Sequence, residues 1–252
     1  MERIGVVGCG LMGSGIAEVC ARRGLDVTVR EIDQGALEAG RRRIIASLDR
    51  AARNQKISDD ERSRALSRLT FTTDLGDLAD REFVLEAVAE NELLKSEIFA
   101  ALDKVVEDSA AIFASNTSSV PIMKVAIATS RPEQVIGVHF FNPVPVLKLV
   151  ELVPSLLTTE QTRDRAEAFV TRQLGKQVIR STDRAGFVVN ALLVPYLLSG
   201  IRMLESGFAS AEDIDAGMVL GCAHPMGPLR LCDLIGLDTI KAIAESMYDE
   251  FK

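Results

Sequence analysis

The sequence predicts an α/β fold: a mostly parallel sheet with a helical-hairpin insertion, followed by a smaller all-helical domain. Short apolar, β-branched segments alternate with segments of helical periodicity, which is typical of βαβ units. A long polar segment with helical spacing interrupts this alternation in the first third of the chain. The strand pattern then stops after about residue 184, and only helical patterns follow.

Strand-like segments are predicted at residues 3–7, 26–30, 82–87, 111–115, 135–139, 148–153 and 177–180. The insertion covers about residues 34–69, between the second and third of these. Within it, Ser58 and Glu61 have the spacing of a capping box, which predicts the start of a second helix. We therefore expect two antiparallel helices that project from the edge of the sheet.

The last part of the chain predicts helices at residues 186–205, 211–220 and 228–251, separated by Gly, Ser and Pro. The change from strand–helix alternation to helices alone indicates a domain boundary. We expect one domain over residues 1–184 and a second over residues 185–252.

Composition narrows the functional classes. The chain has 252 residues and a formal net charge of −7, which argues against a general nucleic-acid binder. Its four cysteines form no CxxC pair and there are only two histidines, so disulfides and a zinc site are not expected. The start of the chain lacks signal-peptide features. The most apolar later segment, residues 191–198, is too short to span a bilayer and contains Pro195. A soluble, cytoplasmic protein without nucleic-acid or membrane partners is expected.

A glycine-rich turn follows the first strand and reads Gly8-Cys9-Gly10-Leu11-Met12-Gly13. Gly8 permits a tight turn, Gly10 lets a pyrophosphate approach the backbone, and Gly13 lets helix and strand pack closely. The helix that follows offers unpaired N–H groups and the positive end of its dipole to phosphates. A GxGxxG pattern alone is weak, but here it follows a strand and opens a helix. It predicts a Rossmann-like dinucleotide site in which residues 8, 10, 11, 12 and 13 contact the cofactor.

Glu31 follows the second strand at the distance expected for the residue that binds the adenosine ribose. Its carboxylate can accept hydrogen bonds from ribose hydroxyls and would repel a 2′-phosphate, so NAD is favoured over NADP. The neighbouring Arg30 could pair with such a phosphate. We expect it to point away, because adjacent strand residues face opposite sides of a sheet.

His139 closes a predicted strand at its carboxyl end, the edge where open α/β sheets bind ligands. Glu151 is expected on an adjacent strand. A carboxylate that holds one imidazole nitrogen fixes the tautomer, which suits a base that removes a hydroxyl proton. The spacing alone leaves a catalytic pair and a structural pair equally open.

Three ordered motifs carry a family resemblance: residues 113–119 (FASNTSS), 139–151 (HFFNPVPVLKLVE) and 186–190 (GFVVN). The chain resembles L-3-hydroxyacyl-CoA dehydrogenases, a family that includes the bacterial 3-hydroxybutyryl-CoA dehydrogenases, from residue 3 to about residue 250. The resemblance implies NAD-dependent interconversion of 3-hydroxyacyl-CoA and 3-oxoacyl-CoA in fatty acid metabolism, with short acyl groups favoured.

The resemblance also implies roles for individual residues. His139 would be the general base and Glu151 would orient it. Ser118 would contact the substrate hydroxyl and the nicotinamide, and Asn190 would reach the substrate from the second domain. Further cofactor contacts would come from Glu90, Lys95 and Asn142. The active site would lie in the cleft between the domains.

Each of these residues also has a structural interpretation. Ser118 and Asn142 could cap turns, Glu90 and Lys95 could begin a solvated helix, and Asn190 could cap one. We interpret His224, in a loop between helices, as structural. The basic run at residues 41–43 is interpreted as a solvated helix face, with attraction of substrate phosphates as the alternative.

The sequence departs from the family in two places. Ser47 matches a serine that faces coenzyme A, but Asn54 stands where the family has a lysine, with Arg53 and Lys56 nearby. The acyl group could therefore arrive on a carrier protein instead. Family members also continue past residue 252, in the helical domain that forms their homodimer contact, and a homodimer is expected here.

Two other classes of protein fit the sequence less well. The lysine-dependent β-hydroxyacid dehydrogenases place a lysine one turn before their asparagine, where this chain has Gly186. A non-catalytic dinucleotide-binding protein could keep the glycines alone, but the presence of His139, Glu151, Ser118 and Asn190 together disfavours it.

Overall fold

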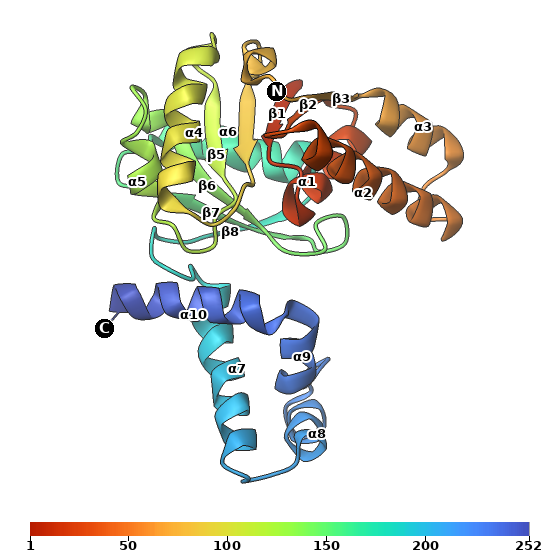
Figure 1. Cartoon of the computed structure of the whole chain (residues 1–252), viewed down its shortest axis with the longest axis vertical. Helices are drawn as coiled ribbons and strands as arrows, with labels where there is room; N and C mark the ends of the chain where they lie inside the picture. Colours follow the sequence, from red (N-terminus) through yellow and green to blue (C-terminus); the bar gives the residue numbers. More distant parts are fainter. Residues whose placement is uncertain (252) are drawn as a thin grey trace. The chain divides into compact units, whose positions relative to one another are not determined.

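The computed structural model describes residues 1–251 and divides into two compact units, Met1–Asp183 and Arg184–Lys252. The first unit is built on one eight-stranded sheet with the strand order β3-β2-β1-β4-β5-β6-β7-β8 (Figure 1). Every neighbouring pair is parallel except β6 and β7. The predicted α/β class and the mostly parallel sheet are therefore confirmed.

The central strands are β1 (Arg3–Val7), β4 (Phe83–Glu86), β5 (Ile112–Ser115) and β6 (Val135–Phe140), and they are almost completely buried. On one side of β1 lie β2 (Asp26–Arg30) and the edge strand β3 (Leu69–Thr72); beyond β6 lie β7 (Leu149–Pro154) and β8 (Gln177–Arg180). Near-continuous apolar runs are what a sheet covered on both faces requires.

Helices cover both faces of this sheet. On one face, α1 (Leu11–Arg22), α6 (Glu160–Ala168) and the following π-helical turn (Phe169–Gln173) share one hydrophobic cluster with the strands. On the other lie α4 (Glu92–Val105) and α5 (Ile122–Ala126). There the rings of Phe99 and Phe113 meet edge to face at 6.3 Å. Short 3₁₀ turns occupy Leu75–Leu78 and Pro132–Gln134.

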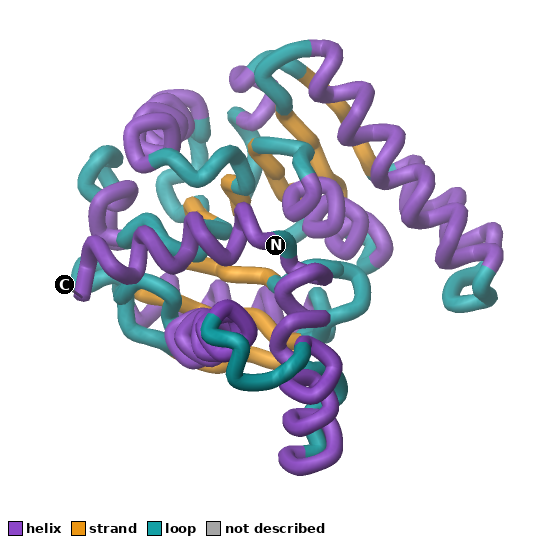
Figure 2. Tube along the Cα trace, turned by 60° about the horizontal axis from the view of Figure 1, so that its bottom comes forward, coloured by secondary structure: helices purple, strands orange, loops and turns teal. Residues whose placement is uncertain are grey.

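The polar insertion forms the expected hairpin of α2 (Gln34–Arg53) and α3 (Asp59–Ser67) beside the β3 edge (Figure 1). In the rotated view the hairpin again extends beyond the strands (Figure 2). The predicted capping box is present, with Ser58 Oγ accepting from Glu61 N and Glu61 Oε2 accepting from Ser58 N. The edge strand β3, which follows α3 after Arg68, was not predicted from the sequence.

The second unit contains four helices within the described residues: α7 (Val189–Glu205), α8 (Ala211–Cys222), α9 (Pro228–Ile235) and α10 (Leu237–Phe251). Two predicted boundaries were wrong. Gly186 and Phe187 adopt positive φ and precede the helix that was expected to begin at residue 186. Gly236, at φ 95°, separates α9 from α10, which were expected as one helix.

Candidate active site

The turn between β1 and α1 is built as a dinucleotide cradle. Gly8 has φ 91°, and an ideal Cβ there would lie 2.6 Å from the carbonyl oxygen of Ala87. A Cβ at Gly13 would overlap the carbonyl oxygen of Gly8, so helix and turn touch backbone to backbone. Gly10 precedes α1 with no side-chain cap, and a Cβ there would meet nothing within 4 Å. Open space before an uncapped helix start is what a pyrophosphate needs.

A cavity of about 450 Å³ opens beside this turn. It is lined by the turn (Gly8, Gly10), by residues 87–89 after β4, by one face of α4 and by residues 30–32 after β2. Apolar walls suit an adenine ring and a polar end suits a ribose. The first unit therefore fits the adenosine half of a nicotinamide dinucleotide.

Glu31 is one of the residues that line this cavity. Its Oε1 accepts a hydrogen bond from Cys9 N at 2.5 Å, and its Oε2 accepts one from Ile32 N at 3.0 Å. The carboxylate is thus held beside the glycine turn, and each oxygen keeps a lone pair for a ribose hydroxyl.

Arg30, whose side chain was expected to point away from this region, is the last residue of β2. Arg30 and Glu31 line the same cavity. The alternation rule does not apply because β2 ends at Arg30, so Glu31 already lies outside the pleated strand.

His139 and Glu151 face each other on the antiparallel strands β6 and β7, where they are register partners. His139 Nδ1 lies 2.8 Å from Glu151 Oε2, and both side chains are buried. The ring of Phe141 packs edge-on against the imidazole at 4.7 Å. With Nδ1 bound to the carboxylate, a proton exchanged with a substrate would pass through the other ring nitrogen, Nε2.

Lys176 donates hydrogen bonds to the backbone of the loop that joins these two strands. Its Nζ donates to the carbonyl oxygens of Val144 at 2.7 Å and Leu147 at 2.6 Å. Burial, together with the nearby Arg23 charge, lowers the pKa of this ammonium. Asn142 lies in the loop and is exposed, so it is open to a ligand.

Ser118 lies in the loop after β5, and Glu90 organises that loop. Glu90 Oε1 accepts from the backbone N–H groups of Ser118 and Ser119, both at 2.9 Å, and from the hydroxyl of Thr117. Burial would raise the pKa of Glu90, but the ammonium of Lys95 and the hydroxyl donors outweigh it and hold the pKa below its usual value.

Lys95 forms ion pairs with Glu90 and with a second carboxylate, that of Glu86. Its Nζ lies 2.7 Å from Glu86 Oε1 and 3.1 Å from Glu90 Oε2, and its side chain is only 1% exposed. Glu86, fully buried, also accepts from Ser115 Oγ at 2.6 Å. Neither Glu86 nor Ser115 was predicted from the sequence as a site residue. The sequence does contain a signal for Glu86, namely a glutamate at the end of the apolar run that forms β4.

The other residues predicted from the sequence lie at α2, in α7 and in the loop after α8. Ser47 lies half-buried on α2, and Asn54 is the exposed C-terminal cap of that helix. Asn190 is a buried residue in the first turn of α7, where Val188 and not Asn190 is the N-cap. His224 Nδ1 lies 3.2 Å from Tyr196 Oη, within the second unit.

Over residues 1–251, no cluster of three or more His, Cys, Asp or Glu side chains could hold a metal ion. Across the same residues, the helices are too short or too polar to cross a bilayer.

Comparison with known proteins identifies the family. A family model described as the NAD binding domain of 3-hydroxyacyl-CoA dehydrogenase matches residues 3–184, and one described as its C-terminal domain matches residues 186–252. The chain is 62% identical to a 3-hydroxybutyryl-CoA dehydrogenase of Mycobacterium tuberculosis, over 100% of this chain and 88% of that protein. It is 41% identical to the human mitochondrial hydroxyacyl-coenzyme A dehydrogenase, over 99% and 81% of the two chains. The crystal structure of (S)-3-hydroxybutyryl-CoA dehydrogenase from Ralstonia eutropha matches with a TM-score of 0.94 and 44% identity, over 100% and 88%. This chain belongs to the NAD-dependent 3-hydroxyacyl-CoA dehydrogenase family.

Proposed function

We propose that this chain interconverts L-3-hydroxyacyl-CoA and 3-oxoacyl-CoA with NAD as the cofactor, and that 3-hydroxybutyryl-CoA is the preferred substrate. The buried His139–Glu151 pair, in the unit that carries the dinucleotide cradle, is the observation that carries this proposal. The names of the relatives at 62% and 44% identity support the short acyl chain.

The cradle and cavity in the first unit would hold NAD through Gly8, Gly10, Gly13 and Glu31, and NAD supplies the hydride acceptor. His139 Nε2 accepts the proton of the substrate hydroxyl as the C3–H bond is oxidised. Glu151 accepts the hydrogen bond from Nδ1–H and stabilises the imidazolium that forms. In the reverse direction the imidazolium returns the proton to the oxygen.

Ser118 and Asn190 are the proposed polar partners of the substrate oxygens. Donors placed where negative charge develops stabilise an alkoxide-like transition state. The hydrogen bonds from the 118–119 backbone to Glu90 fix the loop that carries Ser118 and support that assignment. Lys95 then acts through Glu90, because its ammonium is buried against two carboxylates.

The carrier of the acyl group is proposed to be coenzyme A, with Ser47 on α2 as a contact. Absorbance at 340 nm with NADH and acetoacetyl-CoA tests this, repeated with NADPH and with an acetoacetyl-acyl carrier protein. Rapid loss of NADH absorbance with acetoacetyl-CoA is expected. Turnover of the carrier-protein thioester alone would reassign the substrate, and no turnover despite NADH binding would refute the proposal.

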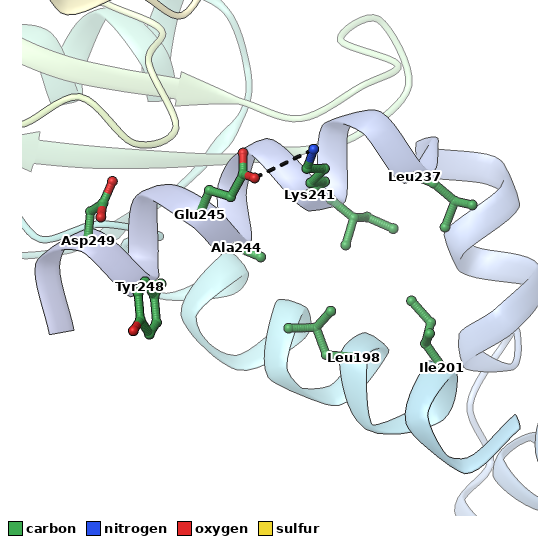
Figure 3. A pocket seen from close by; sticks show the side chains of 9 residues that line it. Leu198, Ile201, Leu237, Lys241, Ala244, Glu245, Tyr248 and Asp249 are labelled. Atoms are coloured by element: carbon green, nitrogen blue, oxygen red, sulfur yellow. Dashed lines mark ion pairs between the residues drawn. The ribbon is translucent and has the colours of Figure 1, made fainter. Parts of the chain in front are cut away.

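A homodimer through the second unit is also proposed. A hollow of about 640 Å³ between α7 and α10 is lined mainly by apolar side chains, among them Leu198, Ile201 and Leu237 (Figure 3). Leu237 is 60% exposed. Covering so apolar a surface with a second copy would remove it from water. Sedimentation of the wild type and of Leu237→Asp tests this: the wild type should be dimeric and the variant should shift toward monomer.

We place the protein in the cytoplasm. All four cysteines are free, and three of them are buried, which suits a reducing compartment.

A further inference from the structure

Strand β6 extends beyond its parallel neighbour β5 at the end that carries His139. β5 ends at Ser115, which pairs with Gly137, whereas β6 continues to Phe140. His139 therefore lies on a part of β6 that β5 no longer accompanies. Phe140 is only 1% exposed, and a buried backbone N–H group needs an acceptor. A backbone acceptor on β5 is no longer available at this point.

The side chain of Asn116 supplies an acceptor instead. Its Oδ1 accepts a hydrogen bond from Phe140 N at 2.8 Å. Because the partner is an N–H donor, the amide oxygen and not the amide nitrogen must face it. The backbone of Asn116 is itself anchored, since its N–H donates to the carbonyl oxygen of Glu86 at 2.8 Å. Asn116 therefore links the carboxyl ends of β4, β5 and β6.

This link joins the segments that carry two of the proposed substrate contacts. Ser118 follows Asn116 by two residues, and His139 directly precedes Phe140. On the β4 side the loop that contains Ser118 is fixed by Glu90, which accepts from Ser118 N at 2.9 Å. The hydrogen bond of Asn116 fixes the start of the same loop on the β6 side. The position of the loop relative to His139 depends on both attachments.

We propose that Asn116 is a positioning residue, which sets the placement of Ser118 relative to His139 through its hydrogen bond to Phe140 N. This inference rests on the proposed function. In this role Asn116 acts through the backbone of β6 and does not contact the reacting atoms. Hydride transfer with simultaneous proton transfer is sensitive to alignment, and a displacement of about 1 Å can cost about a hundredfold in rate. Removal of the acceptor should therefore slow the chemical step while the cofactor still binds.

Two variants of similar size separate the hydrogen bond from the shape of the side chain. Asn116→Leu keeps a branched side chain without an acceptor, and Asn116→Asp keeps an acceptor oxygen. In Asn116→Leu the kcat with NADH and acetoacetyl-CoA should fall by about tenfold or more. The KM for acetoacetyl-CoA and the NADH dissociation constant should stay within about threefold of wild type. Asn116→Asp should restore most of the lost kcat.

A kinetic isotope effect distinguishes positioning from a structural role. With NADH deuterated at the transferred hydrogen, the isotope effect on kcat should increase in Asn116→Leu, because hydride transfer then limits the rate more than product release does. A purely structural role would lower the melting temperature and leave the isotope effect of the folded enzyme unchanged. If Asn116→Leu does not bind NADH, Asn116→Ala carries the same test with a smaller side chain.

Thr158→Val is the matched control. Thr158 Oγ1 donates to the carbonyl oxygen of Val135 at 2.6 Å, so this change removes a side-chain hydrogen bond from the opposite end of β6. It should lower thermal stability and leave kcat and the isotope effect unchanged.

Three outcomes would overturn the inference: wild-type kcat and isotope effect in the folded variant without an acceptor, an Asn116→Asp enzyme no faster than Asn116→Leu, or an equal loss of kcat in Thr158→Val. A wild-type enzyme that did not turn over acetoacetyl-CoA would overturn the proposed function, and this inference with it.

Discussion

Gly13→Ala should disrupt the dinucleotide cradle, because helix α1 and the glycine turn touch through backbone atoms at this point. An ideal Cβ at Gly13 would overlap the carbonyl oxygen of Gly8 and lie 2.9 Å from its carbonyl carbon. Neither atom belongs to a side chain that could rotate away. The start of α1 and the turn must therefore separate.

The size of the effect follows from two opposing contributions. Overpacking of this kind costs about 3 kcal/mol when backbone must move, and alanine returns about 1 kcal/mol of helix propensity. The net loss of about 2 kcal/mol corresponds to a melting temperature lower by about 4–8 °C for a unit of this size. The displaced N–H groups should also weaken NADH binding by about tenfold or more.

Gly217→Ala is the matched control. Gly217 also lies inside a helix, α8, but a Cβ there would meet nothing within 4 Å. It should therefore show only the propensity gain, with NADH affinity unchanged. Differential scanning calorimetry and NADH fluorescence titration measure both variants. If Gly13→Ala behaved like Gly217→Ala in both assays, the close approach of turn and helix would be refuted.

Three further predictions concern Glu90, Glu151 and the cysteine thiols. Glu90→Gln should lower kcat by about tenfold and flatten the acid unfolding curve. The lowered pKa of Glu90 means that its ionised form adds stability above about pH 4.5, which is lost as the pH falls through the folded value; an acid transition identical to wild type would contradict this. Glu151→Gln should reduce kcat by about a hundredfold or more, because a neutral amide lacks the negative charge that stabilises the imidazolium; wild-type kcat would assign Glu151 a structural role. For the thiols, burial raises the pKa of Cys9 and of Cys20 to about 12. In the native protein only the exposed Cys222 should react rapidly with a disulfide reagent at neutral pH. Stability due to these two thiols should be lost as the pH rises from 9 toward 12, and rapid reaction of a second cysteine would contradict their burial.

Much of the fold could be predicted because the sheet leaves a clear apolar pattern. Strands buried on both faces, such as β1 and β6, are continuous apolar runs bounded by turn residues. The strand β3 was missed for the opposite reason. It has four residues that are mostly half-buried, pairs only with β2, and follows α3 without a turn signal.

The sequence predicted the location of the site better than the interactions between its side chains. Pattern and motif placed His139 and Glu151 on adjacent strands, and the register pairs them directly. The buried Glu86–Lys95 pair was not foreseen, because sequence spacing does not reveal which charged side chains are buried.

The most direct test of the central claim is the turnover of His139→Gln, measured by NADH absorbance at 340 nm with acetoacetyl-CoA, alongside its NADH dissociation constant. If His139 is the proton donor and acceptor, kcat should fall by about 10²–10⁴, while NADH binding should stay at the wild-type level. Turnover that survives the substitution would contradict the mechanism, whatever the family to which the chain belongs.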